Sequence, residues 1–267
     1  MFSGVTDFID GLTTDPSGTL ITLAYVAVCI LFSLILHECA HGWVALKCGD
    51  PTAKMLGRLT LNPAKHLDPF GTVCMVLLHF GWAKPVPVNP RNFRHFRRDY
   101  ILVSMAGIIV NVLLCVISLV ISALLCRFIY NAYLIDYVRQ NGLQNNLIDS
   151  YHMMFPYAIS NGDFQIVSGN VMPGAEWAMY LQRFFLMLAE MNLALAVFNL
   201  IPVPPLDGYR FLDMFVFRGK LMLDPRISQM ISLGFMILLL SGVLNRLIGT
   251  VNSFVFGNLS SFISMLV

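Results

Sequence analysis

Residues 16–46 read PSGTLITLAYVAVCILFSLILHECAHGWVAL, and this stretch decides the class of fold. Its first part, residues 16–36, contains no Asp, Glu, Lys or Arg. A helix that rises about 1.5 Å per residue crosses the apolar core of a bilayer, about 30 Å thick, in about 20 such residues. We therefore expect a membrane-spanning helix that begins near residue 18 and ends near residue 46.

The composition of the whole chain supports a membrane protein. Of its 267 residues, 57% are hydrophobic and 12% are charged, whereas a soluble domain carries about 25% charged residues. The net charge of +2 is too small to indicate a nucleic-acid partner. The first 17 residues contain no Lys or Arg, so a cleavable signal peptide is not expected.

Further apolar stretches predict additional spans. Residues 100–126 and 227–245 contain no charged residue, and residues 177–201 contain two. The predicted spans are 18–46, 100–127, 177–201 and 226–246, all within a single integral membrane domain, 1–267. The tail, residues 247–267, is uncharged but rich in Gly, Ser and Asn, so it is either a fifth span or an interfacial helix.

The region between the first two spans has a different character. Residues 57–63, GRLTLNP, alternate in the way typical of a short strand. Residues 83–90, AKPVPVNP, are compatible with an edge strand, because Pro85 and Pro87 both lack an N–H group on the same side. The apolar residues 70–80 are too few to span a bilayer as a helix and are expected to be re-entrant or interfacial.

The basic residues predict the orientation in the cell membrane. Nine Lys and Arg lie between residues 47 and 99 and four between residues 202 and 226, together 13 of the 17 in the chain. Alternation of the spans places both regions on one side, which the positive-inside rule makes the cytoplasmic side. The loop 131–176 then lies outside.

Residues 37–41, HECAH, carry the clearest chemical signal. On a helix, residues four apart share a face, so His37 and His41 can bind one metal ion, and Glu38 can act on a water beside it. Both histidines lie roughly 9–15 Å below Lys47, the first charge at the end of this helix. Ionisable groups at that depth are costly and usually functional, which argues against two core histidines beside an unrelated acid. We therefore predict one Zn²⁺ per chain, with Glu38 as the catalytic residue.

A catalytic zinc ion needs a third protein ligand, which the HECAH motif does not supply. Asp207 follows the third span in residues 199–208, NLIPVPPLDG, where Gly208 is expected to let the chain turn and leave the carboxylate free. Asp68, in HLDP at residues 66–69, is predicted on the same side of the membrane. An Asp beside a Gly is often only a turn residue, so the residues themselves favour Asp207 over Asp68 without deciding between them.

These motifs together resemble the site-2 proteases, which are intramembrane zinc metalloproteases. The resemblance covers residues 18–245 and is carried by HECAH at 37–41, GIIVN at 107–111 and FNLIPVPPLDG at 198–208, with LNPAKHLDPFGT and GWAKPVPVNPRNFR between them. It is strongest to the compact bacterial members without PDZ or CBS domains. The resemblance implies that Asp207 is the third zinc ligand and that Asn199 helps to hold the substrate or the oxyanion.

Asn111 and Asn199 are polar residues within apolar stretches. For Asn111, a hydrogen bond between helices and a role in the site are equally open. For Asn199 a role in the site is favoured, because it lies one turn before the loop that carries Asp207. Both are candidate residues for contact with the substrate or the oxyanion.

The expected fold is that of an all-α polytopic membrane protein. A three-helix catalytic core, 18–46, 100–127 and 177–201, is joined by one or two further helices and a small membrane-associated β-sheet. The resemblance implies hydrolysis of peptide bonds in membrane-protein segments at or within the bilayer, so membrane proteins and lipid are the expected partners. Two alternatives are an inactive zinc-binding homologue that escorts membrane proteins and a metal transporter, although the internal repeat typical of transporters is missing from the sequence. The oligomeric state is not indicated.

Overall fold

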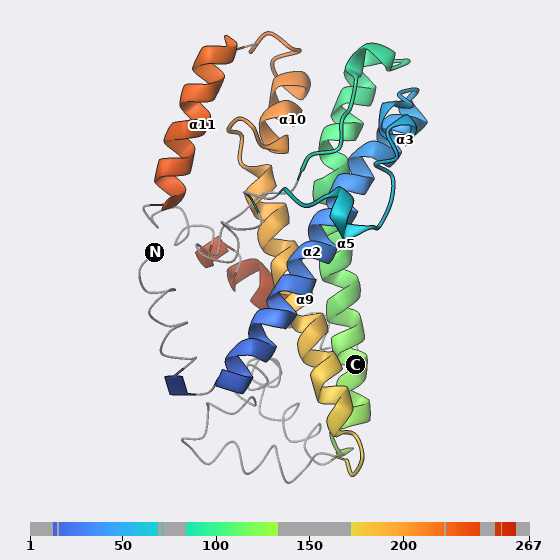
Figure 1. Ribbon diagram of the computed structural model, residues 1–267, viewed down its shortest axis with the longest axis vertical. Helices are drawn as coiled ribbons and strands as arrows, with labels where there is room; N and C mark the ends of the chain where they lie inside the picture. The colour runs from blue at the N-terminus through green and yellow to red at the C-terminus, as the bar shows by residue number, and fades with distance from the viewer. Residues whose placement is uncertain are drawn as a thin grey trace.

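Three long helices form the body of the molecule (Figure 1). The computed structural model describes residues 13–14, 16–68, 71, 84–132, 172–221, 223–240, 249–251 and 253–259. The long helices are α2 (Pro16–Cys48), α5 (Phe96–Ile129) and α9 (Glu176–Leu200), and each is long and apolar enough to cross a membrane. Their ends differ by one to four residues from the predicted spans 18–46, 100–127 and 177–201, so a helix is confirmed at each of the three places.

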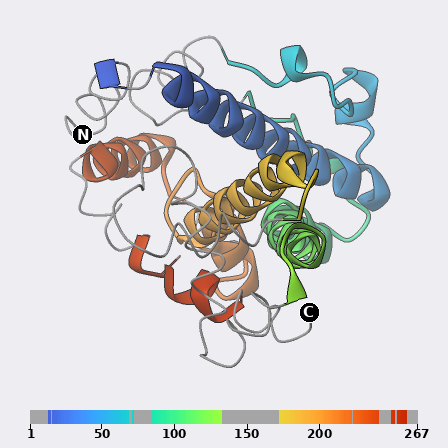
Figure 2. The ribbon, with the colours of Figure 1, turned by 90° about the horizontal axis from the view of Figure 1, so that it is seen from below.

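The three helices pack side by side, and consecutive helices run in opposite directions (Figures 1 and 2). The buried cluster between α5 and α9 consists mainly of small and medium side chains: Cys115, Leu119, Ala123, Leu186, Ala189 and Leu193. Other apolar side chains of α5, such as Leu113 and Ile117, are exposed on its outer face. This distribution suits a bundle covered by lipid, because apolar side chains facing lipid tails need no burial within the protein.

The predicted small β-sheet is not supported. Residues 57–63 form turns between α3 (Thr52–Met55) and the 3₁₀-helix η1 (Pro63–Lys65). Their backbone is used locally, since Arg58 N–H donates to Ala53 O at 2.9 Å and the Asn62 side chain accepts from Ala64 N–H. The described part of the chain has only isolated bridge residues and no paired strands. The alternation of apolar residues here therefore reflects a sequence of turns and a helix cap.

Residues 84–89 form an extended segment, which we call the strap and which leads into the 3₁₀-helix η2 (Pro90–Asn92). Three of its residues precede a proline, a position that favours extended backbone. At one end, Lys84 N–H donates to His66 O at 2.8 Å, and at the other Asn89 N–H donates to Asp50 Oδ2 at 2.7 Å. Of the predicted edge strand 83–90, residues 84–89 are extended, Pro90 begins η2, and residue 83 lies outside the described residues. The strap bonds to a carboxylate side chain and to a turn instead of to another strand.

Asp50 fixes the strap to the end of α2. Its side chain is fully buried and also accepts hydrogen bonds from Asn92 Nδ2, at 2.8 Å, and from the backbone and hydroxyl of Thr52. Burial by itself would raise the pKa of Asp50, but these hydrogen bonds hold it below its ordinary value. The carboxylate is therefore a charged anchor that joins the strap to the residues that follow α2.

Two shorter helices follow α9. The helix α10 (Asp207–Phe215) is held against the start of α5 by Arg97, whose guanidinium donates to Met214 O at 3.2 Å and Phe215 O at 3.0 Å. The helix α11 (Pro225–Leu240) is apolar but shorter than the three spanning helices. It covers the first part of the predicted span 226–246, whose remainder lies outside the described residues.

Some predicted features cannot be compared with the structure. Apart from Gly71, the predicted re-entrant residues 70–80 lie outside the described residues, as does most of the loop 131–176. In the tail, the described residues 249–251 and 253–259 are helical. Whether the tail is a fifth span or an interfacial helix stays a prediction.

Candidate metal centre

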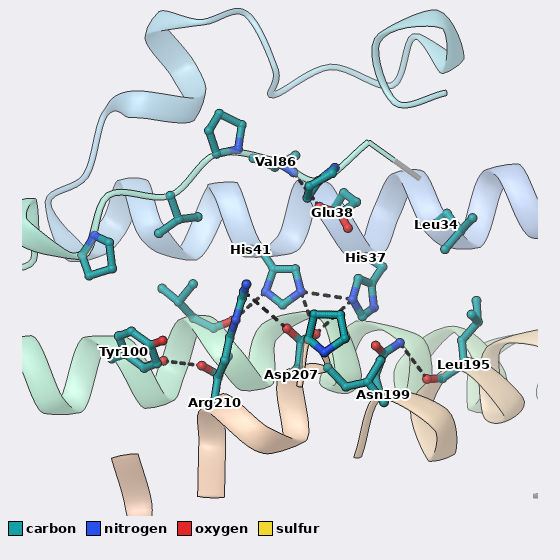
Figure 3. A pocket seen from close by; sticks show the side chains of 18 of the residues that line it. Leu34, His37, Glu38, His41, Val86, Tyr100, Leu195, Asn199, Asp207 and Arg210 are labelled. Carbon is teal, nitrogen blue, oxygen red and sulfur yellow. Dashed lines mark hydrogen bonds and ion pairs between the residues drawn. The ribbon is translucent and has the colours of Figure 1, made fainter. Parts of the chain in front are cut away.

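His37 and His41 lie on one face of α2, as their spacing predicts (Figure 3). The Nε2 atoms of the two rings are 3.1 Å apart, and the two residues are only 5% and 8% exposed. Two imidazole nitrogens this close together inside an apolar bundle offer one ion a pair of ligands. The HECAH motif is therefore folded in the arrangement that metal binding requires.

Asp207 completes a group of three potential ligands. It is the first residue of α10, and its Oδ2 lies 3.2 Å from His37 Nε2 and 3.0 Å from His41 Nε2. Burial alone would raise the pKa of Asp207, but the two histidines lower it well below its ordinary value. Asp68 is not part of this group. Its Oδ1 instead accepts a hydrogen bond from Gly71 N–H at 2.9 Å.

Gly208 allows Asp207 to reach the histidines, although for a different reason from the one predicted. Its backbone is not in the left-handed region that favours glycine. A Cβ at this position would instead lie 2.3 Å from Leu200 O and 2.8 Å from Ile201 O. Glycine is required because the start of α10 packs directly on the backbone at the end of α9, and this contact brings the carboxylate of Asp207 to α2.

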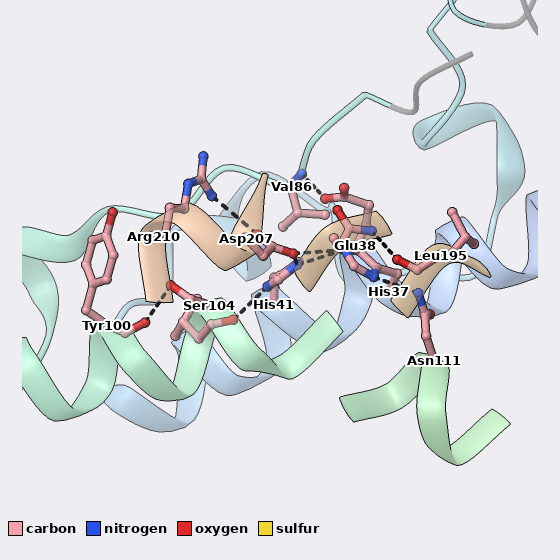
Figure 4. A network of polar contacts seen from close by, with 12 residues as sticks. His37, Glu38, His41, Val86, Tyr100, Ser104, Asn111, Leu195, Asp207 and Arg210 are labelled. Atoms are coloured by element: carbon pink, nitrogen blue, oxygen red, sulfur yellow. Dashed lines mark hydrogen bonds and ion pairs between the residues drawn. The ribbon is translucent and has the colours of Figure 1, made fainter. Parts of the chain in front are cut away.

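The remaining polar atoms of the three residues are also oriented by the protein (Figure 4). His41 Nδ1 lies 2.7 Å from Val103 O, which accepts its N–H. His37 Nδ1 lies 3.1 Å from the side-chain amide of Asn111. Asp207 Oδ1 lies 3.9 Å from the guanidinium of Arg210. Partners on the far side of each ligand are a regular feature of metal sites, where they fix the ring tautomer and the direction of the ligand atom.

A zinc ion suits this set of donors. Two histidines and one carboxylate are a known catalytic zinc set that leaves a position for water. Ligands about 2.0–2.1 Å from a tetrahedral ion lie roughly 3.3 Å apart, and the three donor atoms here are 3.0–3.2 Å from one another. With Nε2 of each ring facing the ion, each Nδ1 carries the hydrogen. Val103 O accepts one of these hydrogens. The amide nitrogen of Asn111 lies beside the other, and turning this amide over would bring its buried, unpartnered oxygen into position to accept it.

Asn111 and Asn199 occupy different places. Asn111 is fully buried behind His37, whereas Asn199 lines the cavity beside the metal-binding group. One amide hydrogen of Asn199 is donated to Leu195 O at 2.9 Å. Of the two, Asn111 can therefore orient His37, and Asn199 is the one exposed to the cavity.

A cavity of about 730 Å³ opens on the three potential ligands (Figure 3). Its wall is formed by residues of α2, α5, α9, α10 and the strap, among them Leu34, Tyr100, Phe198, Asn199 and Arg210. Glu38 lines it on the side of the strap, and its Oε2 accepts the Val86 N–H at 2.7 Å. An acid beside a metal-binding group in a largely apolar cavity is the arrangement expected of a hydrolytic site.

Several contributors to this site have no clear signal in the sequence. Val103 and Val86 act through backbone groups, which any residue type would supply. Arg210 follows Asp207 by three residues and could have been noticed as a neighbour on the same face of a helix. Gly107 is part of the GIIVN stretch, but its contact with His37 depends on how α5 packs against α2.

Gly107 gives a test of this packing. A Cβ at this position would lie 2.4–2.6 Å from the ring atoms of His37. We expect Gly107→Ala to displace the ring and to weaken zinc binding about 10- to 100-fold, as measured by competition with a chelator. Gly234→Ala is the matched control, because a Cβ there meets nothing within 4 Å. Equal zinc affinities of the two variants would show that His37 does not depend on this close approach.

Comparisons with known proteins agree with the geometry. Over 217 residues the chain is 36% identical to the "Putative zinc metalloprotease YwhC" of Bacillus subtilis. The aligned residues cover 81% of this chain and 79% of that relative. The chain is also 26% identical over 205 residues to the "Putative zinc metalloprotease Rip2" of Mycolicibacterium smegmatis. This alignment covers 73% of the chain and 61% of that relative. No solved structure gives a significant match.

A family model extends the comparison beyond single relatives. The model of peptidase family M50 matches residues 25–242, a range that includes the three potential ligands, Glu38 and the strap. This match confirms the resemblance to site-2 proteases, and the three spanning helices make the protein a multi-pass membrane protein. The chain belongs to peptidase family M50, a family of zinc metalloproteases.

Proposed function

We propose that this protein is an intramembrane zinc endopeptidase that hydrolyses peptide bonds in membrane-spanning segments of other proteins. The observation that carries the proposal is the group formed by His37, His41 and Asp207 within a bundle of spanning helices. Both histidines belong to a helix that is long enough to span the bilayer, and the carboxylate reaches them from α10. A metal centre in this place meets a substrate at the depth of the membrane.

The cavity suits an unfolded segment of a membrane protein. Its walls come from all three spanning helices, and most of its lining is apolar. A peptide bond in a helix is shielded by its own turns, so the segment must be extended before hydrolysis, and its backbone groups then need new partners. Asn199, Arg210 and the backbone of the strap are polar groups at the cavity that can supply them.

Each residue of the site has a distinct chemical role in the proposed reaction. His37, His41 and Asp207 hold the zinc ion, which when bound supplies the Lewis acidity that polarises the scissile carbonyl. Glu38 accepts a proton from the attacking water and delivers it to the leaving amine. Asn199 has a second amide hydrogen beside the one given to Leu195 O, and this hydrogen can be donated to the developing oxyanion.

We further propose that the site opens toward the cytoplasm. The end of α2 and the start of α5 lie at the same end of the bundle (Figure 1). Exposed basic residues gather there: Lys47, Arg94, Arg97 and Arg98. The positive-inside rule places such a cluster on the cytoplasmic side, where it can also contact anionic headgroups.

A comparison of membrane peptides tests the proposed function without a known substrate. Cells that lack the protein would be compared with cells that express it, and the new chain ends in the membrane fraction would be mapped by mass spectrometry. We expect ends within or next to spanning segments that appear only when the protein is expressed. Protein-dependent ends confined to soluble domains, or none at all, would contradict intramembrane hydrolysis.

A further inference from the structure

The strap presents its backbone N–H groups to the protein in an ordered way. In extended backbone, successive residues point to opposite sides. Lys84 N–H donates to His66 O and Val86 N–H donates to Glu38 Oε2, at 2.8 Å and 2.7 Å. The residues that alternate with them, Pro85 and Pro87, have no N–H to offer. Val86 N–H is therefore the donor that the central part of the strap directs at the site (Figures 3 and 4).

We propose that the backbone N–H of Val86 positions Glu38 for its role as the catalytic base, an inference that rests on the proposed function. The hydrogen bond holds Oε2 of Glu38 at the strap, which leaves Oε1 to receive the proton from water. A free glutamate side chain samples many rotamers, and ordering it during the reaction would cost free energy. A charge-assisted hydrogen bond made beforehand removes most of this cost.

Packing on α2 keeps the donor in place. The side chain of Val86 is buried and lies over Gly42, where a Cβ would come within 2.9 Å of Val86 Cγ1. Glu38 and Gly42 are four residues apart and share one face of the helix. A single residue of the strap thus contacts two consecutive turns of α2, with its side chain on one and its N–H on the other.

The strap is also fixed on both sides of Val86. His66 O holds Lys84 on one side, and the buried carboxylate of Asp50 holds Asn89 on the other. The N–H therefore has little freedom to follow Glu38 if the glutamate moves. It acts as a fixed point that defines one position of the carboxylate.

Kinetics of three variants test the positioning role. Val86→Pro removes the N–H, Val86→Ala keeps it but shortens the side chain, and α-hydroxyvaline introduced at position 86 keeps the side chain but replaces the N–H with an ester oxygen. The probe is a peptide that contains a cleavage site found by the mapping of membrane fragments. We expect kcat of Val86→Pro and of the ester to fall about 10- to 100-fold below that of Val86→Ala, with KM and zinc content unchanged. Equal or higher kcat without the N–H would overturn the proposal.

Hydrogen exchange gives a test that needs no substrate. Between residues 85 and 90 only Val86, Val88 and Asn89 have a backbone N–H, so a peptide from the strap reports on few amides. We expect Glu38→Ala to speed exchange at Val86 on the order of tenfold, while Glu38→Gln, which keeps an acceptor oxygen, retains the protection. Unchanged exchange in Glu38→Ala would overturn the contact itself. An intact contact in a protein that cleaves no peptide would contradict the proposed function instead.

Discussion

Replacement of Glu38 by Gln is expected to lower peptide hydrolysis by about 10²- to 10⁴-fold while zinc remains bound. Glutamine has the size and shape of glutamate, but its amide cannot accept the proton of the attacking water. It retains an oxygen that can accept the Val86 N–H, so the strap should keep its place. The three proposed ligands, His37, His41 and Asp207, are unchanged, and Glu38 is not one of them.

The measurement pairs turnover of a mapped substrate peptide with zinc content by elemental analysis. Wild-type zinc content with lost turnover would place the defect in the proton transfer. Full turnover in Glu38→Gln would remove Glu38 from the mechanism. If no membrane peptide is cleaved even by the wild-type protein, the alternative of an inactive homologue that escorts membrane proteins gains support.

Replacement of Asp207 by Ala is expected to weaken zinc binding by more than about 100-fold. The substitution leaves two histidines, and a catalytic zinc site needs three protein ligands. It also removes the carboxylate whose Oδ2 lies within 3.2 Å of both Nε2 atoms, so the two rings lose their shared partner. Zinc that stays bound at high occupancy after dialysis against a chelator would reject Asp207 as a ligand.

Asp68→Ala is the control for this experiment. Both aspartates are predicted on the same side of the membrane and both follow a leucine. Asp68 accepts from Gly71 N–H and has no part in the metal-binding group. We therefore expect normal zinc content in Asp68→Ala. Loss of zinc from both variants would point to a general defect of folding.

The sequence predicts the parts of this molecule that depend on local pattern. Long uncharged stretches predict the three spans, because only a helix satisfies its own backbone in lipid. The HExxH spacing predicts the histidine pair, because residues four apart meet on one face of a helix. In both cases the relevant partners lie close in the chain.

The remaining features depend on contacts between distant segments. The choice of Asp207 over Asp68 follows from the contact of Gly208 with the end of α9, which no local pattern reveals. Val103 O and Val86 N–H belong to the backbone and leave no mark on residue type. The error over residues 57–63 arose because alternation of apolar residues also fits turns whose donors are used nearby.

The prolines of the strap also bear on how copies of this protein behave toward one another in a crowded membrane. A permanently extended segment is a hazard, because its edge can pair with the same segment of a second molecule and start a growing assembly. Such a ladder requires each edge to donate and to accept in turn. On the side facing away from Glu38, Pro85 and Pro87 offer carbonyl acceptors but no N–H, and the N–H of Asn89 is already donated to Asp50. The straps of two molecules therefore cannot pair as strands along this edge. The protein can keep an extended segment beside its cavity without forming polymers through it.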